Sequence, residues 1–157
     1  MNVEILVIGK TKTKYAQEGL KEYLSRLKHY LSVELKELPD IKNTGRQTEK
    51  QQKEEEGKAF LSRINPGDFV ILLDERGKQY TSREFADKLQ RLMGSGRKKT
   101  VFLTGGPYGF SDEVYSRKNE MISLSKMTFN HEMVRVFFAE QLYRAMTILR
   151  GEPYHHD

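Results

Sequence analysis

The sequence predicts an α/β fold in which a mostly parallel sheet carries helices on both faces. Short apolar segments of strand length alternate along the chain with longer segments whose apolar residues recur every three or four positions. Residues 3–8 and 69–73 are almost continuously apolar, which is typical of parallel strands covered on both faces. This alternation of strands and helices favours a parallel sheet between two helical layers.

The first quarter of the chain is predicted to form a strand, a helix and a second strand. Residues 3–8 form the first strand, and the apolar positions of residues 15–31 have helical spacing. Val33 and Leu35 alternate with charged neighbours, as in a shorter strand nearer an edge of the sheet. Residues 39–47 are polar and rich in turn formers, so we expect the most mobile loop of the protein there.

Two capping-box spacings mark the starts of the next two helices. Thr48 is followed three residues later by Gln51, and Thr81 is followed at the same spacing by Glu84. The helix that begins after Thr48 is heavily charged over residues 50–58, and we expect this run to be a solvated face. The strand between the two helices is expected to end at residue 73, before the charged run DERGK.

The last third of the chain is predicted to contain two strands and the longest helix. Residues 101–103 and 121–124 are apolar, and each run is followed by a loop and then by a helix start. From His131 the apolar positions keep helical spacing for almost five turns. Asn130 is a suitable N-cap for this helix, and Glu132 suits its first turn.

The length of 157 residues favours one domain spanning residues 1–157, large enough to bury a core. The chain has no cysteine, which excludes disulfides and thiolate metal sites, and no metal is expected. Apolar runs stay well short of the roughly 20 residues that span a membrane, and the first residues lack the layout of a signal peptide. We therefore expect a cytoplasmic protein. The net charge of +5 mildly favours an anionic partner such as RNA.

Two loops near the C-terminus are predicted to form one small-molecule pocket. Residues 104–110 (TGGPYGF) and 124–129 (LSKMTF) each lie where a strand is followed by a helix. In an open α/β sheet this is the edge where ligands bind, so the earlier chain is expected to supply the floor and a third wall. The alternative for the first loop is a tight turn without a ligand.

Neither loop is an ordinary phosphate-binding loop. The turn after the first strand has one glycine where a dinucleotide fingerprint needs three, and the chain has no Walker sequence. Pro107 removes a backbone N–H from the glycine-rich loop, which suits a flat or neutral ligand better than a phosphate. Met127 and Phe129 are apolar loop residues that suit an adenine ring or a thioether. Alternatively, they plug the sheet edge or a subunit interface.

The helix after the second loop favours a homodimer. Phe137 and Phe138 are adjacent, so the apolar stripe is wide enough to serve both the sheet and a partner chain. The chain ends in a tail with two histidines among its last three residues. This tail is either a disordered end or a segment that closes an active site with an imidazole that titrates near neutrality.

At these residues the chain resembles the RlmH family, small SPOUT-class methyltransferases that modify large-subunit ribosomal RNA. The resemblance spans the whole chain and is most specific in GGPYG at 105–109, SLSKMTF at 123–129 and GEPYH at 151–155. The pattern departs from the family at Thr104, where an aliphatic residue is usual, and at Asn130, where proline is frequent.

The resemblance implies an α/β fold whose C-terminal segment forms a deep trefoil knot that binds S-adenosyl-L-methionine. It implies a homodimer with cofactor sites near the interface, and methyl transfer to N3 of a pseudouridine in 23S ribosomal RNA of the assembled ribosome. Carried over position by position, the expected cofactor-binding residues are Leu73, Gly105, Leu124, Ser125, Lys126, Met127, Thr128 and Phe129.

The residues expected to assist catalysis lie in the tail. N3 of a uracil-type base carries a proton at neutral pH, so a general base or a stabiliser of the N3 anion is expected. Tyr154 and His155 are the candidates, reaching the pocket of the partner subunit; alternatively, they only order the tail against the dimer. Arg135 and Arg144 are expected to contact RNA or to pair with Glu140, and pairing is favoured for Arg144.

Two further classes of function compete with the methyltransferase interpretation. The basic stretches at residues 10–14 and 97–99 are candidate phosphate contacts or ordinary solvated loops. A non-enzymatic nucleotide- or RNA-binding module that uses this basic surface is the leading alternative. An oxidoreductase on a Rossmann-like sheet is disfavoured because the dinucleotide fingerprint is missing.

Overall fold

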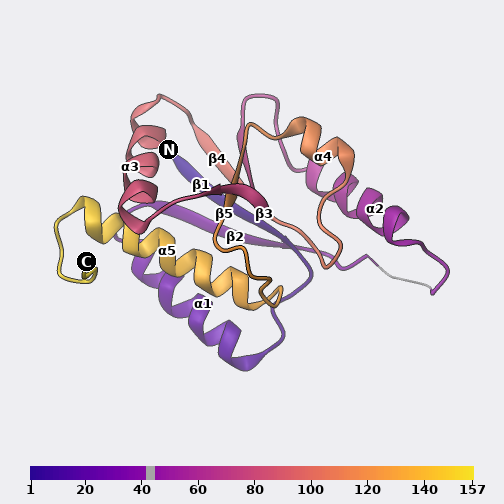
Figure 1. Cartoon of the computed structure of the whole chain (residues 1–157), viewed down its shortest axis with the longest axis horizontal. Coiled ribbons are helices and arrows are strands. Elements are labelled where there is room, and N and C mark those ends of the chain that lie inside the picture. The colour runs from indigo at the N-terminus through magenta and orange to yellow at the C-terminus, as the bar shows by residue number, and fades with distance from the viewer. Residues whose placement is uncertain (42–44) are drawn as a thin grey trace.

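A five-stranded sheet forms the centre of the computed structural model, which describes residues 1–41 and 45–157. The strand order is β2–β1–β4–β3–β5, and every pairing of these strands is parallel (Figure 1). The predicted α/β sheet is therefore confirmed. The elements in chain order are β1 (Asn2–Ile8), α1 (Lys14–Leu27), β2 (Ser32–Leu38), α2 (Glu49–Leu61), β3 (Phe69–Gln79), α3 (Ser82–Gly94), β4 (Lys99–Thr104), α4 (Asp112–Arg117), β5 (Glu120–Ser123) and α5 (Met133–Leu149).

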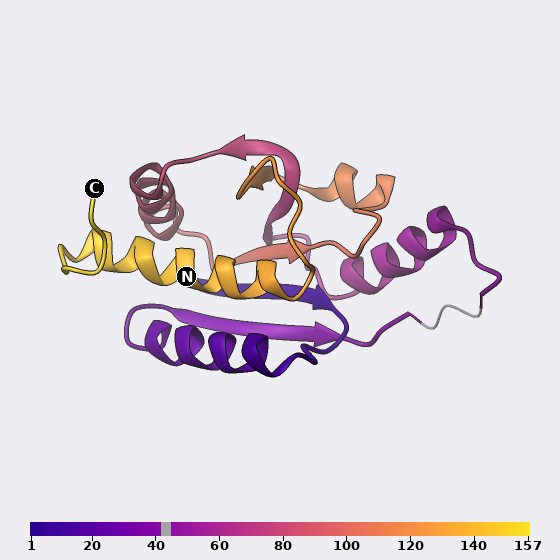
Figure 2. The same ribbon diagram turned by 60° about the horizontal axis from the view of Figure 1, so that its bottom comes forward.

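Helices cover both faces of the sheet, as predicted (Figures 1 and 2). Successive side chains of a strand point to opposite faces. In β1, Val3, Ile5 and Val7 therefore join the core that α1, α3 and α5 cover. Leu6 joins the smaller core beneath α2 and α4. The sheet is thus buried on both faces, and α5 packs against both α1 and α3.

Local sequence signals start the helices and place the edge strand where expected. Thr48 with Gln51 and Thr81 with Glu84 both form complete capping boxes. β2 lies at an edge of the sheet, as its alternating sequence predicted. Part of the loop predicted to be mobile, residues 42–44, lies outside the described residues. Among those that are described, no helix is both long and apolar enough to cross a membrane.

The predicted end of the third strand at Leu73 is wrong, because β3 continues to Gln79. β5 pairs with β3 up to Leu73 and again at Lys78 and Gln79, with a shift of register between the two stretches. At Gly77 an added Cβ would lie 2.6 Å from the backbone N of Ile122, so only glycine permits this close pairing. The charged run therefore forms an irregularity within a strand and not a connecting loop.

The charged run of α2 was predicted to be a solvated face, and this prediction is wrong for one of its residues. Glu56 is only 4% exposed, and it packs against the loop that follows β4. An added Cβ on Gly106 of that loop would lie 2.6 Å from Oε2 of Glu56. The contact is invisible in the sequence because it joins two segments separated by about fifty positions.

The long helix α5 begins at Met133, two residues later than predicted. Asn130 does cap this turn: its Oδ1 accepts hydrogen bonds from the backbone N–H groups of Glu132 at 2.9 Å and Met133 at 3.3 Å. The carboxylate of Glu132 instead accepts hydrogen bonds from the backbone N–H groups of Lys12 and Thr13, where α1 begins. It therefore compensates the dipole of a different helix.

The prediction that Arg135 contacts RNA or pairs with Glu140 is wrong. Its side chain is 2% exposed. Its guanidinium donates to the carbonyl oxygens of Ile8 at 2.7 Å and Gly9 at 2.9 Å, and to Oγ1 of Thr11 at 2.9 Å. Arg135 therefore fastens the first turn of α5 to the end of β1.

Candidate functional site

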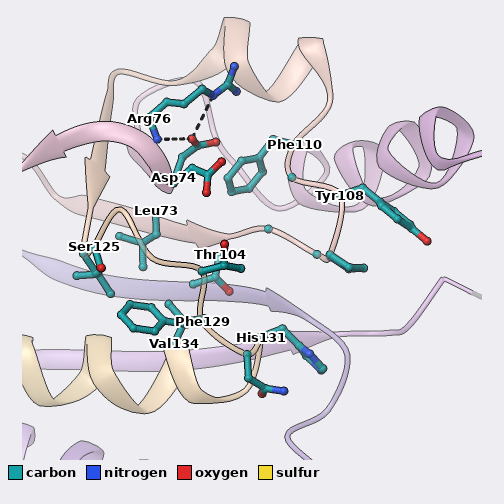
Figure 3. Close-up of a pocket in the computed structure, with 18 of the residues that line it drawn as sticks. Leu73, Asp74, Arg76, Thr104, Tyr108, Phe110, Ser125, Phe129, His131 and Val134 are labelled. Atoms are coloured by element: carbon teal, nitrogen blue, oxygen red, sulfur yellow. Dashed lines mark hydrogen bonds and ion pairs between the residues drawn. The ribbon is translucent and has the colours of Figure 1, made fainter.

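The loops at residues 104–110 and 124–130 meet at the carboxyl ends of β4 and β5 and line one cavity of about 790 Å³. The stretch of β3 at residues 73–76 forms a third wall, and Val134 closes the cavity at the start of α5. Figure 3 shows Asp74, within β3, on one side and Phe129 and Val134, at the start of α5, on the other. The two loops thus share one pocket with a third wall from the earlier chain, as predicted.

A tight β-turn shapes the first loop. The backbone N–H of Gly109 donates to the carbonyl oxygen of Gly106 at 3.1 Å, with Pro107 at the second position of the turn. Proline is favoured there and needs no donor, while Gly109 has a positive φ of 82° that suits glycine. Phe110 is 4% exposed and packs on Phe60 with ring centroids 6.0 Å apart. Phe110 therefore anchors the loop in the core while also lining the cavity.

Serine hydroxyls hold the second loop. Ser123 donates its hydroxyl to the carbonyl oxygen of Ser125 at 2.9 Å, and Oγ of Ser125 accepts the backbone N–H of Met127 at 2.9 Å. These bonds leave the side chain of Met127 77% exposed. Phe129 packs on Phe137 with ring centroids 5.1 Å apart and stays partly exposed. The loop therefore places apolar side chains at the rim of the cavity.

The third wall carries an acidic side chain held by three donors. Oδ2 of Asp74 accepts the hydroxyl of Tyr115 at 2.5 Å, and Oδ1 accepts the backbone N–H of Arg76 at 2.9 Å and its Nε–H at 3.3 Å (Figure 3). Burial raises the pKa of Asp74, but these hydrogen bonds outweigh it and hold the pKa below its ordinary value. The side chain is only 8% exposed, but because its pKa is lowered it is ionised at neutral pH.

Comparison with known proteins places the chain in a family. Residues 1–155 match the family described as "Predicted SPOUT methyltransferase". The chain belongs to the SPOUT methyltransferases. Three relatives named ribosomal RNA large subunit methyltransferase H come from Parabacteroides distasonis (52% identity, 100% of both chains), Flavobacterium psychrophilum (53%, 99% of both chains) and Bacteroides thetaiotaomicron (47%, 100% of both chains). The predicted resemblance is confirmed, and the SPOUT family implies the C-terminal trefoil knot.

Most of the expected cofactor-binding residues line this SPOUT cavity. Lys126 lies between two lining residues, but it is exposed and does not line the cavity itself. Direct binding of a cofactor by any of these residues stays a prediction. Those that line the cavity are Leu73, Gly105, Leu124, Ser125, Met127, Thr128 and Phe129.

Sequence reasoning missed several lining residues, among them Asp74, Glu75, Arg76 and Tyr115. A signal for the first three existed, because they directly follow a buried run at the carboxyl edge where ligands bind. Nothing in the sequence singled out Tyr115, since a tyrosine in the second turn of a short amphipathic helix is usually a packing residue. Among residues 1–41 and 45–157, no group of three or more His, Asp or Glu side chains gathers as it would around a metal.

The tail residues Tyr154 and His155 do not line the cavity of their own chain. They follow the C-terminal end of α5 (Figure 2), whereas the cavity is lined by Val134 at the N-terminal end of this helix. The 17 residues of α5 span about 25 Å at 1.5 Å per residue. Within one protomer, the two groups of predicted site residues are therefore separated by the length of this helix.

A hydrogen-bonded network holds the tail. Oε1 of Glu140 accepts the hydroxyl of Tyr154 at 2.9 Å and NH2 of Arg144 at 2.5 Å, which confirms the predicted pairing of Arg144. NH1 of Arg144 lies 3.2 Å from Nδ1 of His155, and Nε2 of His155 lies 3.0 Å from Oδ1 of Asp157. A guanidinium has no acceptor, so Nδ1 accepts and the Nε2–H donates, which assigns the neutral imidazole tautomer.

Proposed function

We propose that this SPOUT protein transfers a methyl group from S-adenosyl-L-methionine to N3 of a pseudouridine in 23S ribosomal RNA of the assembled ribosome. One observation carries the proposal: the two loops that resemble the family's donor-binding motifs converge on a single cavity. The full-length identity of about half to proteins named ribosomal RNA large subunit methyltransferase H supports the substrate class. We take residues 1–157 as one domain, and a ribosomal substrate would place its activity in the cytoplasm.

The residues around the cavity fit this cofactor. A volume of about 790 Å³ lies within the usual range of ligand sites. Leu73, Leu124 and Phe129 offer an apolar slot for an adenine ring, and the backbone of Gly105 lets a ligand approach closely. Bound S-adenosyl-L-methionine supplies a methyl group already activated on a positively charged sulfur. The chain's main task is then alignment, which accounts for about 7–11 kcal/mol in well-oriented reactions.

A homodimer would bring the tail to the cavity. α1 and α5 start at the same end, since Glu132 binds Lys12 there, and they end together where Arg150 donates to the carbonyl oxygen of His29 at 3.1 Å. Large apolar side chains are exposed at or near the starting end, including Tyr15 at 56% and Phe137 at 41%. Antiparallel pairing of this surface about a two-fold axis would lay one protomer's tail over its partner's cavity.

Tyr154 and His155 would then have separate roles at the acceptor base. Burial, followed by hydrogen bonds to Tyr23 and Glu140, raises the pKa of Tyr154, so its hydroxyl stays protonated and acts as a donor. The neutral imidazole of His155 can take the N3 proton on Nδ1 once Arg144 releases that atom. The proton's departure leaves a nucleophilic lone pair on N3. General-base assistance of this kind contributes about 10²–10⁴-fold.

Basic side chains beside the cavity are the proposed contacts with RNA phosphates. Lys10, Lys12 and Lys14 are exposed in the turn that Glu132 fastens next to α5. Lys99 belonged to the other candidate stretch, but its side chain is 22% exposed and binds Asp68 at 2.9 Å. Residues 97–99 also lie where β4 begins, at the amino edge of the parallel sheet, whereas the cavity lies at the carboxyl edge. We therefore assign the phosphate contacts to the turn at residues 10–14. Contacts of this kind fix position without reading sequence.

Methyl transfer from labelled S-adenosyl-L-methionine to ribosomes that lack the modification tests the proposal. Assembled ribosomes, separate large subunits and free 23S RNA are compared, and we expect label chiefly in assembled ribosomes. Absence of label in all three would refute the substrate class. Calorimetric titration with the cofactor distinguishes the proposed function from the alternative. Saturable cofactor binding is expected, whereas RNA binding without it would support a non-enzymatic module.

Mixed dimers test whether His155 acts across the interface. His155→Ala removes the imidazole, whereas Gly105→Val damages the cavity, where even a Cβ would lie 3.3 Å from Cζ of Phe110. Each variant alone is expected to be inactive. Random mixing restores one intact composite site in each heterodimer, so about a quarter of wild-type activity is expected. No restored activity would show that the tail does not complete the partner's site.

A further inference from the structure

Asp74 is held in place at the cavity wall by groups from two different elements. Tyr115 of α4 donates its hydroxyl to one carboxylate oxygen, and Arg76 of β3 donates a backbone N–H and Nε–H to the other. A carboxylate has about four acceptor positions, so these three donors leave part of its capacity unused. The ring of Tyr115 is itself fixed by edge contact with Phe110 at 5.7 Å between centroids. Asp74 is therefore a rigid negative group on the third wall.

The positive charge of Arg76 compensates Asp74 only in part. The guanidinium reaches the carboxylate through Nε at 3.3 Å, while its plane lies over the ring of Tyr115 at 4.6 Å and its side chain is 64% exposed. The charged residues that line the cavity comprise two carboxylates, Asp74 and Glu75, against this one guanidinium. A buried charge is screened less by water and salt than an exposed one, so Asp74 dominates the local field.

We propose that Asp74 lets the site distinguish the positively charged methyl donor from its neutral product. This inference rests on the proposed function. In the transfer, the bond between sulfur and the methyl carbon breaks, sulfur keeps the electron pair, and a bond between N3 and the methyl carbon forms as the N3 proton leaves. The cofactor thereby changes from a sulfonium cation to a neutral thioether. A fixed carboxylate attracts the first more strongly, so the site retains the donor and releases S-adenosylhomocysteine.

Tyr115 and Arg76 act as positioning residues in this scheme. Their hydrogen bonds hold the carboxylate in one orientation and keep it ionised despite its burial. Glu75 is the matched comparison, because it lines the same cavity and follows Asp74 directly, yet its side chain is exposed. An exposed carboxylate is surrounded by water and salt, so its electrostatic interaction with a charged ligand is weak.

Calorimetric titration of the full-length wild type, Asp74→Asn, Glu75→Gln and Tyr115→Phe with three ligands tests the inference. The ligands are S-adenosyl-L-methionine, S-adenosylhomocysteine and sinefungin, which carries a protonated amine in place of the sulfonium. We expect Asp74→Asn to lower the affinity for the two cationic ligands about tenfold and the affinity for the neutral product less than about twofold. Tyr115→Phe should lower the affinity for the cationic ligands about threefold. Glu75→Gln should change the affinities for all three ligands by the same factor.

The pattern of affinities separates the possible failures. Equal weakening of all three ligands by Asp74→Asn would overturn the inference and assign Asp74 to a contact that both cofactor forms share. Weakening of S-adenosyl-L-methionine without weakening of sinefungin would overturn it too, because the methyl group and not the charge would then be recognised. If Asp74→Asn lowers the melting temperature, Tyr115→Phe decides the question with the carboxylate in place. A wild type that binds none of the ligands would refute the proposed function itself.

Discussion

Replacing Gly106 by alanine should destabilise the protein through one steric contact. The added Cβ would lie 2.6 Å from Oε2, 2.8 Å from Oε1 and 3.0 Å from Cδ of Glu56. Glu56 cannot swing freely into solvent, because the residue is 4% exposed and Gln52 donates to its Oε1 at 3.3 Å. The backbone of Gly106 does not have a positive φ, so alanine itself is tolerated there and the penalty comes from the contact.

Overpacking of this size costs about 2 kcal/mol. For a chain of this length that corresponds to a fall in melting temperature of about 4–8 °C, measured by differential scanning calorimetry at neutral pH. In a Glu56→Ala background the carboxylate is gone, so most of the penalty of Gly106→Ala should disappear, with a coupling free energy of about 1–2 kcal/mol. Gly67→Ala is the matched control, because nothing lies within 4 Å of its added Cβ.

Two results would refute this reasoning. One is a Gly106→Ala protein that melts at the wild-type temperature while Gly67→Ala does the same. The other is a penalty for Gly106→Ala that is unchanged by Glu56→Ala, which would place the strain elsewhere in the loop.

Three further predictions follow from buried and exposed groups. Burial raises the pKa of Glu56 above 4.5, and the charge of Asp40 adds to this while the Gln52 hydrogen bond opposes it. The stabilising contribution of Glu56 is therefore complete below the pKa of the unfolded chain and is lost as pH rises through the folded pKa. The Glu56→Gln variant should melt at a higher temperature than wild type at pH 7, and this gain should vanish at about pH 4. Arg135→Lys should lower the free energy of unfolding in urea by about 3 kcal/mol, because it leaves buried carbonyl oxygens unpaired; a loss below about 1 kcal/mol would contradict that role. Phe137→Glu should convert the proposed dimer to a monomer in light scattering and abolish methyl transfer, whereas an active monomer would exclude a shared site.

Much of the fold could be predicted because its signals are local. A capping box such as Thr48 with Gln51 is completed within four residues, so its spacing in the sequence already contains the hydrogen bonds. The alternation of apolar segments likewise reports which faces are buried, and the carboxyl edge of a parallel sheet brings successive loops together. The pocket between the two C-terminal loops followed from these rules.

The failures share a different cause. Glu56 reads as one charge in a solvated run, and only its packing against a glycine about fifty positions away makes it a buried carboxyl. The run after Leu73 reads as a loop, yet its return to β5 makes it part of a strand. In the sequence Arg135 looks like an unpaired cation on a helix. In the structure its guanidinium donates hydrogen bonds to three acceptors in residues 8–11.

The sequence by itself determined the kind of fold, the order of its elements and the two loops that face each other, since periodicity and capping depend on neighbours a few residues apart. The tertiary structure alone decided which polar groups are buried and what each one binds. Glu132 illustrates the difference: its place before a helix predicted a role in that helix, but its carboxylate binds the backbone of Thr13, 119 positions earlier. Such partners are chosen by the packing of the whole chain, because a buried polar group must find a hydrogen bond wherever the fold provides one.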